Sequence, residues 1–203
     1  MSKSDSNKRN SRGYRDRDVE TRLPRERFLI VCEGERTEPN YFLNFRVPKE
    51  VLDVQGLGFN TVSLVKKAIE LKRLGEYTQV WCVFDRDSFP PENFNNALSL
   101  AKQRGIRVAY SNEAFELWYL LHFHFFNSAI TREDYKDKLS KLMGKKYEKK
   151  SPTMFDELLE RQSTAIEHAR RLLAVYEVNN PLKNNPSTTV HLLVEELRKH
   201  SKK

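Results

Sequence analysis

The sequence lacks any long uninterrupted run of apolar residues. No segment approaches the roughly 20 apolar residues that a membrane-spanning helix requires, and residues 1–27 are polar and charged, without the apolar centre of a secretion signal. Only two cysteines are present, Cys32 and Cys82, and each lies inside a short apolar run. Thiols in such runs are usually reduced core residues. We therefore expect a cytoplasmic protein without membrane contact, and a length of 203 residues fits one domain with additions.

Internal repeats are also missing, and acidic residues are outnumbered in two segments. Residues 1–27 contain nine Lys or Arg against five Asp or Glu, and residues 131–150 contain eight against four. The rest of the chain is balanced, with 19 basic and 19 acidic residues, so these two segments carry the whole net charge of +8. Such a distribution favours a polyanion as partner, because Lys and Arg that neutralise phosphates release counterions. The plainer interpretation is solubility.

The apolar pattern predicts an α/β fold with three parts. Residues 1–25 have too little apolar surface to order alone and are predicted to be a disordered basic arm. In residues 26–125, short buried runs alternate with helical stripes, which predicts a mostly parallel, Rossmann-like sheet flanked by helices. Residues 126–203 are predicted to be a helical extension packed on this core. The predicted strands lie at 28–33, within 48–60, at 79–84 and at 106–111, and the predicted core helices begin near 38, 61, 92 and 114.

Acidic residues close the two strongest predicted strands. Glu33 follows FLIVC, and Asp85 and Asp87 follow QVWCVF. Ligands of an open parallel sheet bind beyond the carboxyl ends of its strands, so these carboxylates meet if the two strands are neighbours. Close carboxylates repel one another, and a hard dication removes the conflict. The D-x-D of Asp85 and Asp87 would be a weak signal alone, but an acid followed by Gly34 also closes the earlier strand. The two features together predict a site for Mg²⁺ or Mn²⁺.

Four ordered blocks resemble the RloB family of bacterial defence-associated proteins. They are CEGERTEPNYF (32–42), VWCVFDRD (80–87), SNEAFELWYLLHF (111–123) and NPSTTVHLLVEEL (185–197). The strand ending in Glu-Gly and the later D-x-D also resemble the Toprim domain of topoisomerases, primases and overcoming-lysogenization-defect nucleases. The resemblance implies a Toprim-like core with a helical extension, and a role in abortive infection or phage defence beside a companion ATPase. It also implies that Glu33 binds metal or serves acid–base chemistry, and that Asp85 and Asp87 bind Mg²⁺.

The sequence leaves open which further acids complete the metal site. Many Toprim proteins have a second acid four residues after the first, whereas this chain has Glu35 and Glu38, two and five residues after Glu33. We favour Glu38, because Thr37 is expected to cap the helix that presents it. Glu116, near the start of the 114–123 helix, is either a further ligand or base, or a first-turn glutamate that the helix dipole favours.

Other conspicuous polar residues are given structural roles. His122 is expected to be a buried, hydrogen-bonded histidine, and Tyr41 to be packed in the core. Asn112 is interpreted as a turn residue rather than part of the site. Ser187 and Thr188 are expected to cap the last helix, with phosphate binding as the alternative.

The function expected from this pattern is that of a metal-dependent nuclease. Two Mg²⁺ ions about 4 Å apart would clamp the attacking water and the leaving oxygen of an in-line phosphodiester hydrolysis. The substrate would be RNA, tRNA included, or DNA, held by the arm and by residues 141–150, with Tyr147 as a stacking platform. The expected catalytic residues are Glu33, Asp85, Asp87, Glu38 and Glu116, and the first four are the expected metal ligands.

The alternative is a catalytically quiet subunit that binds nucleic acid or docks on a companion ATPase. Its nucleic-acid binding would be indifferent to Mg²⁺ and to Asp85. A nucleotide-sugar transferase that uses the D-x-D is disfavoured, because it leaves Glu33 and Gly34 without a task. The expected partners are nucleic acid, a companion ATPase and further copies of the chain, with no membrane.

Overall fold

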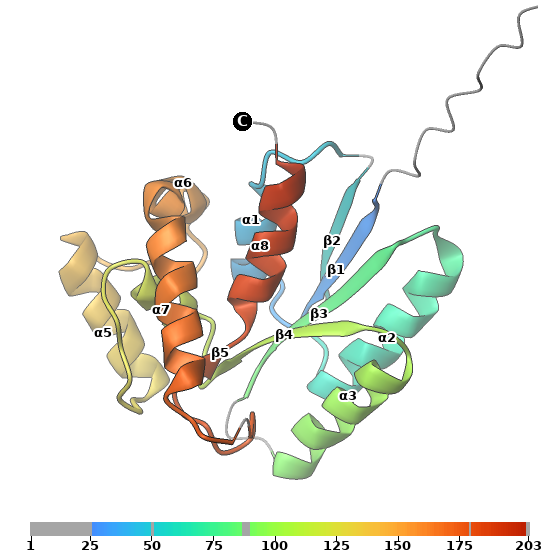
Figure 1. Cartoon of the computed structure of the whole chain (residues 1–203). Coiled ribbons are helices and arrows are strands. Elements are labelled where there is room, and N and C mark those ends of the chain that lie inside the picture. The colour runs from blue at the N-terminus through green and yellow to red at the C-terminus, as the bar shows by residue number, and fades with distance from the viewer. Residues whose placement is uncertain (1–25, 50, 87–89, 179, 202–203) are drawn as a thin grey trace, which may run out of the picture.

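The centre of the molecule is a mostly parallel β-sheet with helices on both faces (Figure 1). The computed structural model describes residues 26–49, 51–86, 90–178 and 180–201. These residues form a five-stranded sheet of order β2-β1-β3-β4-β5, in which the first four strands are parallel and β5 is antiparallel to β4. The α/β, Rossmann-like fold expected from the sequence is confirmed. The strands are β1 (Phe28–Cys32), β2 (Leu52–Gly56), β3 (Gln79–Asp85), β4 (Arg107–Asn112) and β5 (Ser187–Thr188).

The strand order creates a topological switch point between β1 and β3. From β1 the chain moves outward to β2, then returns across β1 to form β3 on its other side. The helices that follow β1 and β3 therefore lie on opposite faces of the sheet, and the loops at the carboxyl ends of these two strands separate. This is the place where open α/β sheets bind their ligands.

One face of the sheet is covered by α2 (Thr61–Leu74) and α3 (Pro91–Gln103) (Figure 1). Alternate strand residues such as Leu29 and Cys82 pack there against the apolar sides of these helices. Strands β1 and β3 are buried on both faces, which explains why their sequences are unbroken apolar runs.

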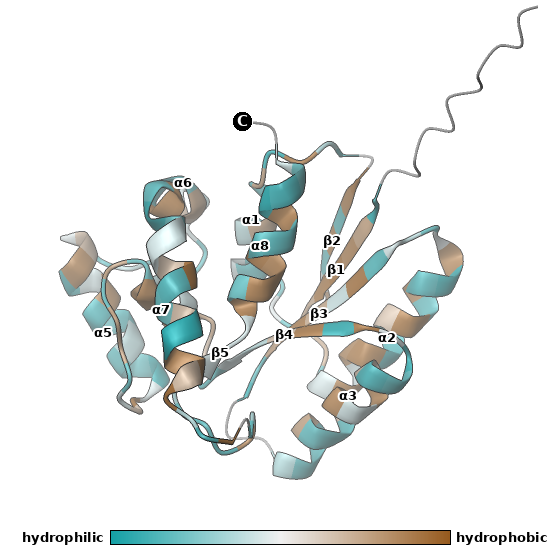
Figure 2. Ribbon diagram, viewed as in Figure 1, coloured by the Kyte–Doolittle hydropathy of each residue, from teal (hydrophilic) through white to brown (hydrophobic). Residues whose placement is uncertain are grey.

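The other face is covered by two layers of helices. Those nearest the sheet include α1 (Thr37–Leu43), α4 (Glu116–Leu121) and α8 (Val190–His200). Outside them lie α5 (Arg132–Met143), α6 (Met154–Leu158), a 3₁₀ turn (Leu159–Arg161) and α7 (Gln162–Ala174) (Figure 1). Residues of these later helices share one continuous core with β1 and β3. In Figure 2 the strands are mostly hydrophobic, whereas the helices carry many hydrophilic positions on their outer sides.

The last predicted helix has a different start from the one expected. Ser187 and Thr188 do not cap it but form β5, and both are fully buried. The Thr188 hydroxyl lies 3.0 Å from that of Ser111, and Thr189 Oγ1 accepts a hydrogen bond from the Tyr110 N–H at 3.0 Å. These groups satisfy the exposed edge of β4, which would otherwise present unpaired backbone. The N-cap of α8 is Thr189, so the predicted cap position was wrong, although the Thr188 hydroxyl accepts a hydrogen bond from the Val190 N–H at 3.2 Å. The burial of Ser187 and Thr188 also removes the phosphate-binding alternative.

Two further local predictions are overturned by tertiary partners. Thr37 is the first residue of α1 rather than its cap, and its hydroxyl donates to the Lys149 carbonyl at 2.8 Å. Asn112 is the last residue of β4 rather than a turn residue, and its side-chain amide donates to the Asn184 carbonyl at 2.9 Å. The predictions on residues 1–25 and on Asp87 lie outside the described residues.

No helix in the described ranges has both the length and the apolar character needed to cross a membrane. Cys32 and Cys82 are buried free thiols, as predicted.

Candidate active site

The switch point brings Glu33 and Asp85 together. Glu33 directly follows β1, and Asp85 is the last residue of the neighbouring strand β3. The Glu33 N–H continues the sheet by donating to the Val83 carbonyl at 2.9 Å, and Glu33 Oε2 accepts a hydrogen bond from the Asp85 N–H at 3.1 Å. The other carboxylate oxygen, Oε1, lies 3.5 Å from the hydroxyl of Thr61. The first acid of the predicted set is therefore held by the backbone of the second.

Glu38, and not Glu35, is the acid of α1 that enters the site. Glu38 is 6% exposed and lines the same pocket as Glu33, whereas Glu35 is exposed and does not line it. The Glu38 carboxylate lies directly over Gly34, where a Cβ would come within 2.0 Å of Glu38 Oε2. Any side chain at position 34 would displace this carboxylate, which gives Gly34 a packing role.

The Glu38 carboxylate is buried without full hydrogen bonding. Burial raises the pKa of Glu38 above its ordinary value. Its Oε2 atom is buried and accepts no hydrogen bond from the described residues. A buried acceptor of this kind is costly unless a cation or donor reaches it.

Asp85 lies in a similar conflict between burial and charge. Burial raises the pKa of Asp85 well above its ordinary value, and the negative charge of Glu38 raises it further. The guanidinium of Arg132 opposes this, with Nη2 at 3.2 Å from Asp85 Oδ2. Glu116 and Glu33 again raise the pKa. One arginine is therefore shared among several carboxylates.

Glu116 closes the deep side of this acidic group. It is the first residue of α4, is only 3% exposed, and accepts a hydrogen bond at Oε1 from the Tyr147 hydroxyl at 3.2 Å. Tyr147 itself is 6% exposed. The prediction that Tyr147 is a stacking platform was wrong, because its hydroxyl is directed inward to Glu116 and its ring is packed in the core.

A pocket of about 390 Å³ opens over these acids. It lies at the carboxyl edge of the sheet and combines acidic, basic and aromatic groups. Its lining residues are Glu33, Gly34, Glu38, Gly58, Phe59, Asn60, Asp85, Arg132 and Lys149. Asp87, the remaining acid of the predicted set, lies outside the described residues, so its predicted role stays a prediction.

Five of these lining residues were not singled out from the sequence, and three of them, Lys149, Phe59 and Arg132, bring a charge or an aromatic ring to the pocket. Lys149 belongs to the basic segment 141–150, so a charge signal existed, and the bond from Thr37 to its carbonyl holds it beside α1. Phe59 had only a weak signal, as an apolar residue between Gly58 and the N-cap of α2. Arg132 belongs to the basic segment 131–150, but nothing local connected it with the acids, because it comes from the start of α5, far along the chain from them.

The donor set fits a hard divalent cation. Within the described residues, no three His, Cys, Asp or Glu side chains are already grouped tightly enough to hold one metal ion. The carboxylates of Glu33, Glu38 and Asp85 nevertheless face one pocket, and the buried oxygen of Glu38 lacks a partner. Oxygen donors of this type suit Mg²⁺ and Mn²⁺.

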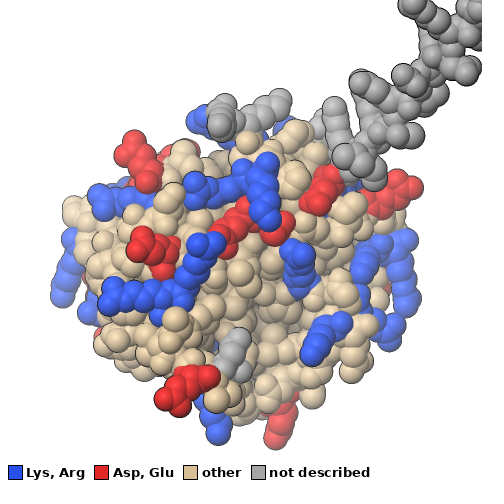
Figure 3. Space-filling model, in the orientation of Figure 1, with Lys and Arg blue, Asp and Glu red and all other residues tan. Residues whose placement is uncertain are grey.

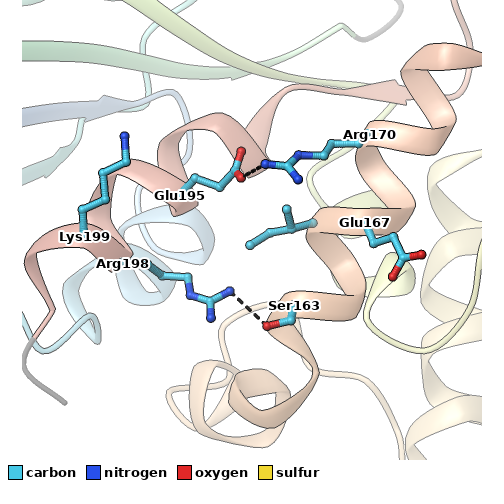
Figure 4. A pocket seen from close by; sticks show the side chains of 7 residues that line it. Ser163, Glu167, Arg170, Glu195, Arg198 and Lys199 are labelled. Atoms are coloured by element: carbon cyan, nitrogen blue, oxygen red, sulfur yellow. Dashed lines mark hydrogen bonds and ion pairs between the residues drawn. The ribbon is translucent and has the colours of Figure 1, made fainter.

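A second hollow is separate from the acidic pocket. This groove of about 660 Å³ is lined by side chains of α7 and α8 alone (Figure 4). Two contacts cross the groove: an ion pair between Arg170 and Glu195, and a hydrogen bond that Arg198 donates to the Ser163 hydroxyl at 3.2 Å. Figure 3 shows the same mixture of basic and acidic groups over this face. The groove therefore contributes nothing to the acidic group.

The structural roles predicted for two other residues are confirmed. His122 is 1% exposed, and its Nδ1 lies 2.9 Å from the Trp118 carbonyl. Tyr41 is 1% exposed and is surrounded by aromatic rings, among them Phe42, Phe115 and Phe155.

The fold and the site together define a doubly wound α/β protein with an acidic pocket at its switch point. The chain belongs to the RloB-like protein family, which matches residues 28–197 and confirms the resemblance seen in the sequence. No match was found among curated proteins or among solved structures.

Proposed function

We propose that this protein is a metal-dependent nuclease that hydrolyses phosphodiester bonds and acts as an effector in phage defence. The observation that carries the proposal is the approach of Glu33 to Asp85 at the switch point, with the unpartnered oxygen of Glu38 in the same pocket. Buried carboxylates that repel one another are costly for folding and are typical of sites that hold a cation.

Glu33, Glu38 and Asp85 would hold the metal, with Asp87 as a further predicted ligand. When bound, Mg²⁺ or Mn²⁺ supplies charge neutralisation at the phosphate and an acidified water. The cationic side chains of Arg132 and Lys149 line the pocket and would pair with phosphate oxygens.

The acids also have tasks of their own. The hydrogen bond from the Asp85 N–H fixes the direction of the Glu33 carboxylate, which preorganises it toward the pocket. Burial raises the pKa of Glu38 above its ordinary value, which makes its charged form unfavourable unless a cation lies beside it. Glu116 is hydrogen-bonded by Tyr147 and acts on the other acids through its charge, so we assign it a positioning role.

The biological role rests on the family. Membership of the RloB-like family is the ground for proposing phage defence, beside a companion ATPase. RNA, tRNA included, is the favoured substrate and DNA the other; this choice rests on analogy with related defence effectors.

A second candidate function is that of a catalytically quiet subunit that binds nucleic acid or docks on an ATPase. The observation in its favour is the ion pair between Arg132 and Asp85, which places a protein cation where a metal would otherwise neutralise charge. This candidate predicts nucleic-acid binding that is indifferent to Mg²⁺.

The proposal is tested by comparing the nuclease activity of the wild type, the variant Glu33→Gln and a matched control variant. Full-length protein is incubated with total RNA and with plasmid DNA, in Mg²⁺ or Mn²⁺ and then in EDTA. We expect metal-dependent cutting by the wild type and a loss of several orders of magnitude in Glu33→Gln, since metal and acid–base effects each supply about a hundredfold or more. Binding should persist, because phosphate contacts do not need this carboxylate.

The control is Glu35→Gln, which removes an exposed carboxylate two residues away. It should cut like the wild type. Cutting by Glu33→Gln at the wild-type rate would remove Glu33 from the mechanism, and a wild type inert with and without its ATPase would favour the quiet subunit.

A further inference from the structure

Phe59 places an exposed aromatic ring at the acidic pocket. Its side chain is 43% exposed, and it lines the pocket together with Glu33, Asp85 and Lys149. Among the large apolar side chains that are exposed in the described part of the chain, it is the one aromatic.

Local packing does not account for this ring. A hydrophobic residue just before a helix N-cap often packs against the fourth helical residue. For α2 the N-cap is Asn60 and that fourth residue is Leu64, which is fully buried in the core. Phe59 belongs to neither core cluster, although its neighbour Leu57 packs against one of them.

The backbone around the ring is tied to the first acid of the site. The N–H of Gly58 donates to the Glu33 carbonyl at 3.0 Å, and the N–H of Leu57 donates to the Cys32 carbonyl at 3.1 Å. On the other side, Asn60 accepts a hydrogen bond from the Ser63 N–H at 3.1 Å. Gly58 has a φ of +63°, which lets the chain turn between these anchors. The backbone of Phe59 is therefore held between two anchored neighbours, one of which is bonded to Glu33.

Groups that favour a phosphate line the same pocket as the ring or begin close to it in the chain. Arg132 and Lys149 line the same pocket. The N-terminus of the 14-residue helix α2 also begins at Thr61, two residues after the ring, and adds partial positive charge. A nucleotide whose phosphate lies near the acids and cations would have its base within reach of an apolar, flat surface.

We infer that Phe59 is a stacking platform for an unpaired base, so that the strand entering the pocket is single-stranded or looped at the point of cutting. This inference rests on the proposed function and specifies its substrate class. A base inside a duplex has neighbours on both faces, whereas an unstacked base has a free face for an aromatic ring. In this inference Phe59 replaces Tyr147 as the residue on which a base stacks, because Tyr147 is buried and bonded to Glu116.

Binding without cleavage tests the inference. Full-length protein in EDTA is titrated into labelled single-stranded RNA, the corresponding single-stranded DNA and a blunt RNA duplex of the same sequence. Phe59→Ala should weaken binding of the single strands about tenfold to a hundredfold, with little change for the duplex. Phe59→Trp should restore it. The control Leu74→Ala removes an 81% exposed apolar side chain at the other end of α2 and should bind like the wild type.

A spectroscopic signal reports stacking directly. 2-Aminopurine in the single strand should lose fluorescence when wild-type protein or Phe59→Trp binds, and lose less with Phe59→Ala at saturation. Circular dichroism of each variant checks that it is folded.

The outcomes separate this inference from the nuclease proposal. If the wild-type protein binds single strands through Phe59 but does not cut them in Mg²⁺, the stacking role of Phe59 is supported and the nuclease proposal is rejected. If Phe59→Ala cuts and binds single strands as well as the wild type, the stacking role is rejected and the nuclease proposal stands. Equal losses on single strands and duplex, or no binding of single strands by the wild type, also overturn the platform.

Discussion

At the scale of single residues, the site combines carboxylates that are unfavourable together. Glu38 is the clearest case, because its Oε2 atom is buried and receives no hydrogen bond from the described residues. Asp85 is also a buried carboxylate close to other negative charges, and the ion pair with Arg132 offsets only part of this unfavourable energy. Groups of this kind lower stability and are found most often at functional sites.

Glu38→Gln should stabilise the metal-free protein. Removing one buried negative charge relieves its desolvation and its repulsion with Asp85 and Glu116, so we expect the free energy of unfolding at pH 7 to rise by about 1 kcal/mol. Urea unfolding in EDTA measures this. Glu35→Gln is the matched control and should change little, since Glu35 is exposed. A less stable Glu38→Gln would show that the buried carboxylate makes a net favourable contact.

Asp85→Asn should weaken binding of Mg²⁺ and Mn²⁺ while the fold is kept. Asn retains the shape but lacks the charge that a hard cation requires. Calorimetric titration with each metal measures the loss, which we expect to be tenfold or more, in line with removal of about 1.4 kcal/mol. The control is Asp53→Asn, an acid of the outer strand β2 that does not line the pocket. Wild-type affinity in Asp85→Asn would show that this acid is not a metal ligand.

At the scale of elements, burial controls a histidine at the end of α4. All six residues of α4 are buried, and its C-cap residue His122 is buried with them. Burial lowers the pKa of His122 from 6.5 to about 4, and the positive charges of Arg161 and His168 act in the same direction. The neutral form is therefore the one that fits the core.

The free energy of unfolding should fall in acid because of this histidine. The unfolded chain takes up the proton near pH 6.5 whereas the folded chain resists until about pH 4, so stability is full above pH 6.5 and is lost as the pH falls through this window. We expect a loss of about 2 kcal/mol between pH 7 and pH 5 from this group. Urea unfolding across this range measures it.

His122→Asn serves as the comparison for that pH profile. It should be less stable at pH 7 but should lose less stability between pH 7 and pH 5. His191, whose pKa is also lowered to about 4 by burial, remains and accounts for a residual slope. A slope equal to the wild-type slope would mean that His122 is not the group responsible.

At the scale of the whole molecule, positive charge is concentrated at two places in the sequence. The segment 131–150 has a surplus of four positive charges, and the structure brings its residues Arg132 and Lys149 to the acidic pocket. Residues 1–27 have the same surplus. Under the proposed function, long-range attraction of a polyanion and close contact at the pocket would therefore involve different parts of the chain.

Deletion of residues 1–25 should weaken nucleic-acid binding and flatten its salt dependence. The slope of log affinity against log salt should fall by about three for single strands, at about 0.7 per neutralised phosphate, because these residues carry a surplus of four positive charges. Thermal stability should be unchanged, since the segment offers almost no apolar surface. An arm of equal length with Lys and Arg changed to Gln is the control for charge. A clear drop in melting temperature on deletion would show that the segment packs on the body.

The sequence by itself determined the sheet and the first members of its site. The apolar runs of β1 and β3 are buried on both faces, so their composition alone marked them as central parallel strands. The acids that close them, Glu33 and Asp85, meet because parallel neighbours end at one edge. These features depend on residues next to one another in the chain, and the family followed from blocks of the same kind.

Only the tertiary structure decided the rest of the pocket. The sequence favoured Glu38 over Glu35 on the expectation that Thr37 caps α1, whereas the structure buries Glu38 through the packing of α1 over Gly34. Lys149 is held beside α1 by a hydrogen bond that the Thr37 hydroxyl donates to its carbonyl, between residues 112 positions apart. Ser187 and Thr188 form the strand β5 because they pair with the otherwise unpaired edge of β4. Each outcome was set by a distant segment that supplied a hydrogen bond, a charge or a contact surface, and the sequence does not indicate which distant segments will meet.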